Sequence, residues 1–465
     1  MLFELTNPEI AIMMMGLFLF AVLLGFPIAF TLMAMGIGFG YYAYYDPALM
    51  ENIFDNRIFR LFINNTYSVM DNTVLTAVPL FLFMGYLVER AGIVAKLFFA
   101  IRLAAHRLPA SMAVAALITC TLFSTATGII GAVVTLMGLL AWPAMVKAGY
   151  DKKFASGIIC SGGCLGILIP PSIMLIIMAD IMQVSVGNLF MACVTPGLIL
   201  AGLYMLFIWV WATVDKKVAP PLPEDAFDVK GGELPMMILK AFLPPVLLIA
   251  LIKGSILLGW ATPSEAGAVG AFGASLLAII AGKLNYKMFK GVLHSSGLTI
   301  AMVFMIILSA TCFAYVFRSL GGDYIVEDLI AEAGLGSWGL LFLLMGMTFL
   351  LGFFLDWVEI TLIILPIFAP LVANLDFGDH VTTESGYEGR TDTLVWFLVL
   401  MAINLQTSFL TPPFGFALFY LKGVAPPEVK TISIYRGVIP FVIIQLIGLG
   451  LVIWDPDIAL TLSKF

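Results

Sequence analysis

Charged residues are scarce in this sequence. Only 11% of its 465 residues are Asp, Glu, Lys or Arg, whereas soluble domains carry roughly 25%. Hydrophobic residues reach 62%, which is more apolar surface than a soluble core can bury. The net charge of −6 comes without a basic stripe of the kind that nucleic acid requires. We therefore expect neither an ordinary soluble domain nor nucleic acid as a partner.

Motifs for catalysis and for transition metals are also missing. Neither HExxH nor GxSxG occurs, and the three histidines, at positions 106, 294 and 380, are far apart. The five cysteines lie in apolar runs without CxxC spacing: Cys120, Cys160, Cys164, Cys193 and Cys312. We interpret them as small buried hydrophobic residues. The sequence therefore predicts no enzyme, no organic cofactor and no transition-metal centre.

Long apolar runs are what the sequence has in abundance. They recur from Ile10 to Trp454, and a membrane helix needs about 20 such residues to cross the hydrocarbon layer. The first run follows Glu4 and Glu9 and lacks the basic flank and cleavage site of a signal peptide, so we expect it to be retained. The predicted fold is an all-α polytopic membrane protein surrounded by lipid.

A proline pair recurs in the middle of two apolar segments. Residues 166–177 align with residues 408–419, which places Pro170-Pro171 over Pro412-Pro413. Proline lacks an amide hydrogen and restricts the residue before it, so each pair ends one helix and begins another. The arms are shorter than a full crossing. We therefore predict two re-entrant helical hairpins, at about 154–180 and about 395–421.

Weaker similarities extend the repeat. Residues 83–92 parallel 313–321, and residues 23–27 parallel 257–263. They divide the chain into a first repeat, 1–235, and a second repeat, 236–465. Discontinuous helices in corresponding places are typical of transporters with inverted repeats and a binding site near the middle of the bilayer.

Polar residues interrupt two further apolar segments, 109–146 and 336–373, so each is predicted to be two helices that meet at a break. Carbonyls freed at a break can replace the water shell of a cation. The oxygen-bearing residues near the breaks are Ser124, Thr125, Thr127 and Ser161 in the first half, and Asp356, Glu359, Thr361, Asn404, Gln406, Thr407, Ser408 and Thr411 in the second. Oxygen ligands favour sodium over transition metals.

Each of these residues also has a structural interpretation. An isolated Ser, Thr or Gly in a membrane helix commonly serves close helix packing. Ionisable residues at membrane depth are functional candidates by default, but Asp356 and Glu359 could instead lie near an interface or pair with a partner subunit.

Several segments together resemble a known family. They are Ile10–Tyr45, Val78–Gly85, Gly166–Ser172, Trp260–Ala266 and Leu410–Gly415, and they are similar to the large membrane subunit of tripartite ATP-independent periplasmic (TRAP) transporters. The resemblance implies a bacterial inner-membrane permease that imports an organic acid by a sodium-coupled elevator mechanism. It also implies two partners, a separate small four-helix membrane subunit and a periplasmic substrate-binding protein.

The resemblance also implies site residues. One sodium site would comprise Ser124, Thr125, Thr127, Gly128, Gly163, Gly166 and Pro170, and a second would comprise Asp356, Glu359, Thr361, Thr407, Thr411 and Pro412. Substrate would bind between the two proline pairs, at Ser161, Ile169, Pro171, Ser172, Gln406, Ser408 and Pro413. No buried arginine offers a counter-charge for an acid, so bound sodium and helix dipoles would have to supply it.

Three matters stay open at the level of sequence. A standalone sodium-coupled carboxylate carrier, which needs no binding protein, would contain the same repeats and helix breaks. The identity of the organic acid is not encoded in these motifs. Inverted repeats require an odd number of crossings between the predicted hairpins, yet six candidates occur. The segments 188–214 and 236–252 are the suspected partial crossings because prolines interrupt both.

Overall fold

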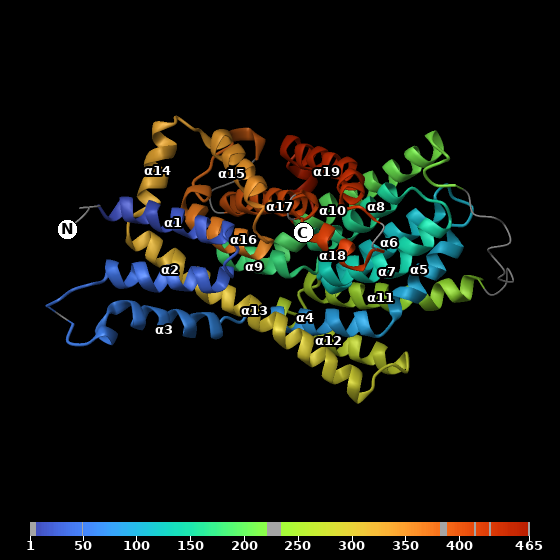
Figure 1. Cartoon of the computed structure of the whole chain (residues 1–465), viewed down its shortest axis with the longest axis horizontal. Coiled ribbons are helices and arrows are strands. Elements are labelled where there is room, and N and C mark those ends of the chain that lie inside the picture. The colour runs from blue at the N-terminus through green and yellow to red at the C-terminus, as the bar shows by residue number, and fades with distance from the viewer. Residues whose placement is uncertain are drawn as a thin grey trace.

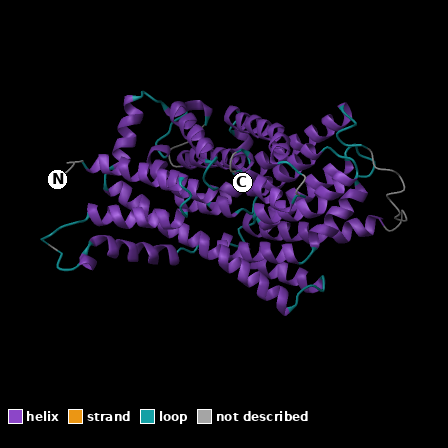
Figure 2. Cartoon of the chain, in the orientation of Figure 1, coloured by secondary structure: helices purple, strands orange, loops and turns teal. Residues whose placement is uncertain are grey.

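The computed structural model describes residues 6–48, 50–220, 234–381, 388–412, 415–426 and 429–463. Within these ranges the regular structure is entirely helical, as Figure 2 shows, which confirms the predicted all-α class. Eight described segments are long and apolar enough to cross a membrane, or up to ten if each of two bent helix pairs is one span. The chain is therefore built as a polytopic membrane protein.

The helices follow in chain order (Figure 1). The first half contains α1 Asn7–Leu23, α2 Ile28–Ala43, α3 Arg57–Met70, α4 Ala77–Arg90, α5 Ile93–Ala104, α6 Ser111–Thr127, α7 Ile130–Lys147, α8 Lys152–Leu168, α9 Ile173–Met182 and α10 Val186–Val214. The second half contains α11 Leu234–Leu257, α12 Pro263–Ile280, α13 Tyr286–Ser319, α14 Gly322–Glu332, α15 Ser337–Leu351, α16 Trp357–Val372, α17 Glu388–Leu410, α18 Phe416–Val424, α19 Thr431–Trp454 and α20 Asp457–Leu460.

An elongated arm occupies one end of the molecule, where α1, α2 and α3 lie beside the long helix α13 (Figure 1). Small residues permit this packing, since a Cβ added at Gly36 of α2 would lie 3.0 Å from Cys312 Sγ of α13. The same long helix also packs against α4, which in turn packs against α12. Helix α11 packs against α12, and we call α1–α4 together with α11–α13 the frame. Helices α6–α10 and α15–α19 pack together beside the frame and form the core.

Helices α6 and α8 run in the same direction. A Cβ at Gly162 would lie 2.9 Å from Cys120 Cβ, and one turn further along both helices Gly166 touches Ser124. Residue numbers therefore rise together along the contact, which defines a parallel pair.

Helices α7 and α8 run in opposite directions. Trp142 Nε1 donates a hydrogen bond to Ser156 Oγ (3.1 Å), and the earlier residue Val134 meets the later residue Gly163. Because α6 is parallel to α8 and α7 is antiparallel to it, α6 and α7 form a hairpin. Gly128 lies at its tip with a φ of +65°, a left-handed conformation that glycine adopts without strain.

The first proline pair does not make the predicted hairpin. Helices α8 and α9 form one continuous candidate span, Lys152–Met182, in which the break at Pro170-Pro171 leaves the direction of the chain unchanged. Ile169 and Ser172 on either side have extended backbone conformations. The prolines remove helical hydrogen bonds but supply no reversing turn. The hairpin predicted at 154–180 is therefore wrong, and the hairpin lies at the polar break of 109–146.

The second half has the same arrangement. The amide of Asp376, just after α16, donates to Ser337 Oγ at the start of α15 (3.2 Å), and Phe377 packs edge-on against Trp338 with ring centroids 5.0 Å apart. The two ends of the segment therefore meet, and α15 and α16 form a hairpin with its tip near Leu355.

Helix α17 runs antiparallel to α19. Trp396 Nε1 donates to the Val452 carbonyl (2.9 Å), while the later residue Gln406 meets the earlier residue Gln445 (3.4 Å). Helix α19 in turn runs parallel to α8, because Gly437 touches Lys153 near the start of both helices. Helix α17 is therefore antiparallel to α8.

Helix α18 continues in the direction of α17. Gly131 of α7 faces the ring of Tyr420, and Gly138 faces Val424, so α18 is parallel to α7. Since α7 and α17 are both antiparallel to α8, α17 and α18 form a broken span. The hairpin predicted at 395–421 is therefore wrong as well, and Pro413 within its break lies outside the described residues.

These corrections resolve the crossing count. Segments 188–214 and 236–252 are full-length candidate spans within α10 and α11, whereas 336–373 folds back on itself. Four spans, α10 to α13, then separate the two broken helices, so α17 points opposite to α8. Each half contains a hairpin, a broken span and a long helix in that order, with opposite directions, as inverted repeats predict. The division at residues 235 and 236 stays a prediction.

Close contact between α8 and α19 depends on glycine. A Cβ on Gly437 would overlap the backbone carbonyl of Lys153, and no rotamer change can relieve a clash with backbone. We expect Gly437→Ala to destabilise the protein by about 1–3 kcal/mol, measured as thermal unfolding in detergent. Gly450→Ala on the same helix is the control, because the space around Gly450 is open. Equal melting temperatures for the two variants would contradict this packing.

Candidate functional site

The tip of the first hairpin is bonded to the broken span. Ser124 Oγ donates to the Gly163 carbonyl (2.5 Å), and Gly166 lies so close to Ser124 that a Cβ would overlap it. The glycines predicted near the first break have no side chains, and this allows the polar hairpin tip to pack directly against α8. The structure brings together three of the seven residues of the first predicted sodium site.

Three other predicted hydroxyls are engaged within their own helices. Thr125 donates to Thr121 O (2.7 Å), Thr127 donates to Phe123 O (2.9 Å), and Ser161 donates to Gly157 O (2.7 Å). These bonds use the hydroxyl hydrogens and leave oxygen lone pairs available.

The break between α8 and α9 is buried, including Ile169, Pro170 and Pro171. Ser172, the N-cap residue of α9, is 2% exposed, and its hydroxyl has no hydrogen-bond partner among the described residues. The backbone amide of Ile173 lies 3.9 Å from the Cβ position of Gly128 at the hairpin tip. An unpartnered hydroxyl in a buried site is costly. Together with the free amides of a helix N-terminus, it marks a place where an anionic or polar group can be bound.

The carboxylates of the second hairpin cap a helix. Asp356 accepts a hydrogen bond from the Trp357 amide (2.7 Å), and the Asp356 amide donates to Glu359 Oε2 (2.5 Å). This reciprocal capping places both carboxyl groups at the positive end of α16. The two side chains thus have a structural role in addition to the predicted one.

The second hairpin tip packs directly on α17. A Cβ on Gly352 would overlap the side chain of Ser408, and the Ser408 hydroxyl is buried without a partner among the described residues. The hydroxyl of Thr361 in α16 is likewise buried and has no hydrogen-bond partner among the described residues. Unsatisfied hydroxyls thus accompany both breaks.

The remaining predicted residues of α17 lie along its last turns. Thr407 donates to Asn404 O (2.6 Å), and Thr411 donates to Thr407 O (2.5 Å). Pro412 follows at the end of the described segment, and Pro413 lies outside the described residues.

Glutamines connect the two broken spans. Gln406 Nε2 donates to the Cys164 carbonyl (3.1 Å), and Gln445 Nε2 donates to Gln406 Oε1 (3.4 Å). All three residues are buried. Gln445 was missed from the sequence, although a lone glutamine in the apolar run 431–454 is a usable signal.

Two further residues lie near the breaks, and no sequence feature indicated either of them. The ring of Tyr420 of α18 packs against Gly131 of α7, next to the first hairpin tip. Lys253 of α11 shares a small cavity of about 20 Å³ with Pro170. Its other lining residues are apolar, and no described carboxylate pairs with Lys253.

Comparisons with known proteins identify the family. Residues 15–458 match the family model described as the DctM component of tripartite ATP-independent periplasmic transporters. The chain is 30% identical to the C4-dicarboxylate TRAP transporter large permease protein DctM of Pseudomonas aeruginosa, over 86% of this chain and 88% of the relative. It is 28% identical to the sialic acid TRAP transporter large permease protein SiaM of Vibrio cholerae, over 85% and 87% of the two chains.

Solved structures show the same fold at low sequence identity. The YdaH transporter of Alcanivorax borkumensis is 12% identical and superposes with a TM-score of 0.59 over 95% of this chain and 97% of its own. MtrF of Neisseria gonorrhoeae is also 12% identical, with a TM-score of 0.52 over 95% and 94%. The resemblance inferred from the sequence is confirmed at the level of family and fold. This chain belongs to the DctM family as a large permease component of a tripartite ATP-independent periplasmic transporter, an integral protein of the bacterial inner membrane.

Proposed function

We propose that this permease imports an organic acid together with sodium ions. The relatives carry names that refer to C4-dicarboxylates, sialic acid, ectoine, 2,3-diketo-L-gulonate and isethionate. The first four have a carboxylate group and isethionate has a sulfonate group, so all five carry an acidic group. The observation that carries the proposal is the set of buried hydroxyls at the two helix breaks that have no hydrogen-bond partner within the described part of the chain: Ser172, Thr361 and Ser408.

Each break offers oxygen atoms to a sodium ion. The first site comprises the tip around Ser124 and Gly128 with the end of α8, and the second comprises Asp356 and Thr361 with the end of α17. Hard cations prefer carboxylate, hydroxyl and carbonyl oxygens. These clusters support the proposal because their oxygen-bearing residues gather at helix ends, with Ser124 in the last turn of α6 and Asp356 at the N-cap of α16.

The substrate carboxylate binds near the N-terminus of α9. Ser172 supplies an unoccupied hydroxyl there, the α9 amides supply a positive dipole, and Lys253 supplies a full positive charge on the adjoining helix. A cavity of about 20 Å³ has room for about one water molecule. The carboxylate therefore enters only when the break separates from α11, which an elevator-type movement of the core against the frame would allow.

The proposed partners are a small four-helix membrane subunit and a periplasmic substrate-binding protein, as the family's tripartite description supports. Uptake of succinate, sialic acid and ectoine into proteoliposomes tests this proposal, with the small subunit present and with sodium gradient and binding protein each supplied or omitted. We expect uptake only when both are supplied. Sodium-driven uptake without the binding protein would identify a standalone carrier instead, and sodium-independent uptake would refute the coupling.

Loss of the Lys253 charge should weaken substrate interaction. We expect Lys253→Gln to raise the KM for a carboxylate substrate about tenfold, because a charge-assisted contact contributes about 1.5–3 kcal/mol. Lys253→Arg should restore much of the affinity. Lys240→Gln is the matched control, since Lys240 lies exposed on the same helix. If both glutamine variants have the KM of the wild type, Lys253 only extends toward water and does not contact substrate.

A further inference from the structure

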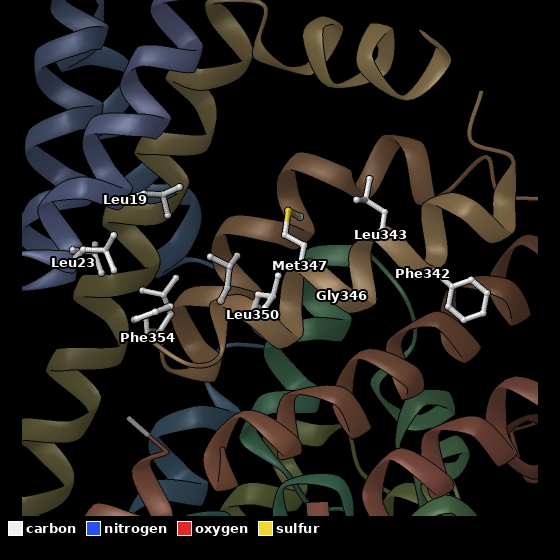
Figure 3. A pocket seen from close by; sticks show the side chains of 11 residues that line it. Leu19, Leu23, Phe342, Leu343, Gly346, Met347, Leu350 and Phe354 are labelled. Carbon is white, nitrogen blue, oxygen red and sulfur yellow. The ribbon is translucent and has the colours of Figure 1, made fainter. Parts of the chain in front are cut away.

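A large apolar cavity lies between the arm and the second hairpin (Figure 3). Its volume is about 660 Å³. Helix α1 contributes Leu19 and Leu23, helix α15 contributes Met347 and Leu350, and the hairpin tip contributes Phe354. All of its lining residues are apolar. The cavity is therefore distinct from the polar breaks at which we place sodium and substrate.

The mouth of the cavity is continuous with apolar surface. Leu23 is 63% exposed, Leu350 is 59% exposed and Phe342 is 55% exposed, and all three belong to the lining. In an integral membrane protein, exposed apolar surface of this kind faces the hydrocarbon of the bilayer. The space between α1 and α15 is thus an inward extension of the lipid-facing surface.

Two alternative occupants do not fit. A carboxylate substrate would lose its hydration without any polar partner in the lining, which is costly. A helix about 10 Å in diameter has a cross-section of about 80 Å². A cavity of 660 Å³ therefore has room for roughly six residues of helix. A transmembrane helix of a partner needs about 20 residues. A single flexible acyl chain is thin enough and apolar throughout.

We propose that this cavity binds one acyl chain of a bilayer phospholipid, wedged between α1 and the α15–α16 hairpin. The site is independent of the solute that the permease carries. Phe354 lies two residues before Asp356 and lines the cavity, so the bound chain contacts the hairpin tip directly. The lipid contact thereby links the arm, the tip and the second cluster of polar groups.

Gly346 allows the cavity to be filled without disturbing the backbone. It lies on the cavity wall, and a Cβ added there would meet nothing within 4 Å. Gly346→Phe, and the smaller Gly346→Leu, should occupy the space of the acyl chain. Gly297→Phe on α13 is the matched control, because Gly297 is also exposed with open space around it but is not part of the lining.

The test uses the purified permease in nanodiscs that contain a phospholipid with a photoreactive group at the end of one acyl chain. Crosslinked peptides are identified by mass spectrometry. We expect labelling of residues 342–355 in the wild type and in Gly297→Phe, and its loss in Gly346→Phe and Gly346→Leu. Thermal unfolding should become less sensitive to delipidation in the two filled variants than in the wild type.

Three results would overturn the inference. Equal labelling of wild type and both Gly346 variants would mean that lipid contacts only the outer surface. Labelling by a headgroup probe but not by the acyl probe would mean that a lipid headgroup, and not an acyl chain, occupies the cavity. Loss of labelling when the small subunit is added to the wild type would show that a protein partner covers the cavity. Failure of sodium-driven uptake would affect the proposed transport function but none of these measurements.

Discussion

Asp356→Asn is expected to leave the permease folded while it weakens the dependence of uptake on sodium. The asparagine Oδ1 can still accept the hydrogen bond from the Trp357 amide, so the cap of α16 is preserved. The substitution removes a negative charge from the second polar cluster. We expect the sodium concentration for half-maximal uptake to rise at least about tenfold, equivalent to about 1.4 kcal/mol.

Two further variants separate capping from ion binding. Asp356→Ala removes both the cap and the charge, so we expect a loss of about 1 kcal/mol of stability in addition to the change in sodium dependence. Glu359→Gln keeps an acceptor for the Asp356 amide and should retain the fold. Uptake is measured in proteoliposomes over a sodium series, and stability by thermal unfolding. A wild-type sodium response in Asp356→Asn would mean that the carboxylate only caps the helix.

The sequence predicted the breaks but not which of them reverse the chain. Proline removes backbone hydrogen bonds and is visible in any sequence, so the interruption at Pro170-Pro171 was predictable. Reversal depends on the conformation of the residues at the break. It occurs at Gly128, whose positive φ turns the chain, whereas Ile169 and Ser172 are extended. Forty-three glycines in the chain offer the same freedom, so composition alone does not locate the turn.

Residues of the candidate site differ in how far sequence could indicate them. Ser124, Asp356 and Ser408 stand out because they are polar residues next to interruptions of apolar runs. Tyr420 and Lys253 reach the breaks only through tertiary packing of α18 and α11. Tyrosine and lysine near helix ends are common in membrane proteins, so nothing local distinguishes these two from their neighbours.

Gly166→Ala is expected to abolish uptake. A Cβ at this position would overlap Ser124 at its Oγ, its Cβ and its backbone carbonyl carbon. The added methyl group must push the tip of the first hairpin away from α8. That movement would break the hydrogen bond from Ser124 Oγ to the Gly163 carbonyl (2.5 Å) and displace the oxygens of the first cluster. Because catalytic and binding geometry tolerates shifts of only about 0.5 Å, we expect no measurable sodium-driven transport.

The cause of this loss can be assigned with two partner variants. Ser124→Gly removes the side chain but leaves the carbonyl carbon in place, so the double variant Ser124→Gly with Gly166→Ala should remain inactive. Gly163→Ala meets only the Val134 side chain at 2.5 Å, apart from a longer contact with backbone nitrogen at 3.8 Å, and rotation of that side chain can relieve the clash. We therefore expect Gly163→Ala to retain part of the uptake. Rescue of Gly166→Ala by Ser124→Gly would show that the hydroxymethyl group alone, and not the close approach of the two backbones, sets the geometry of the first break.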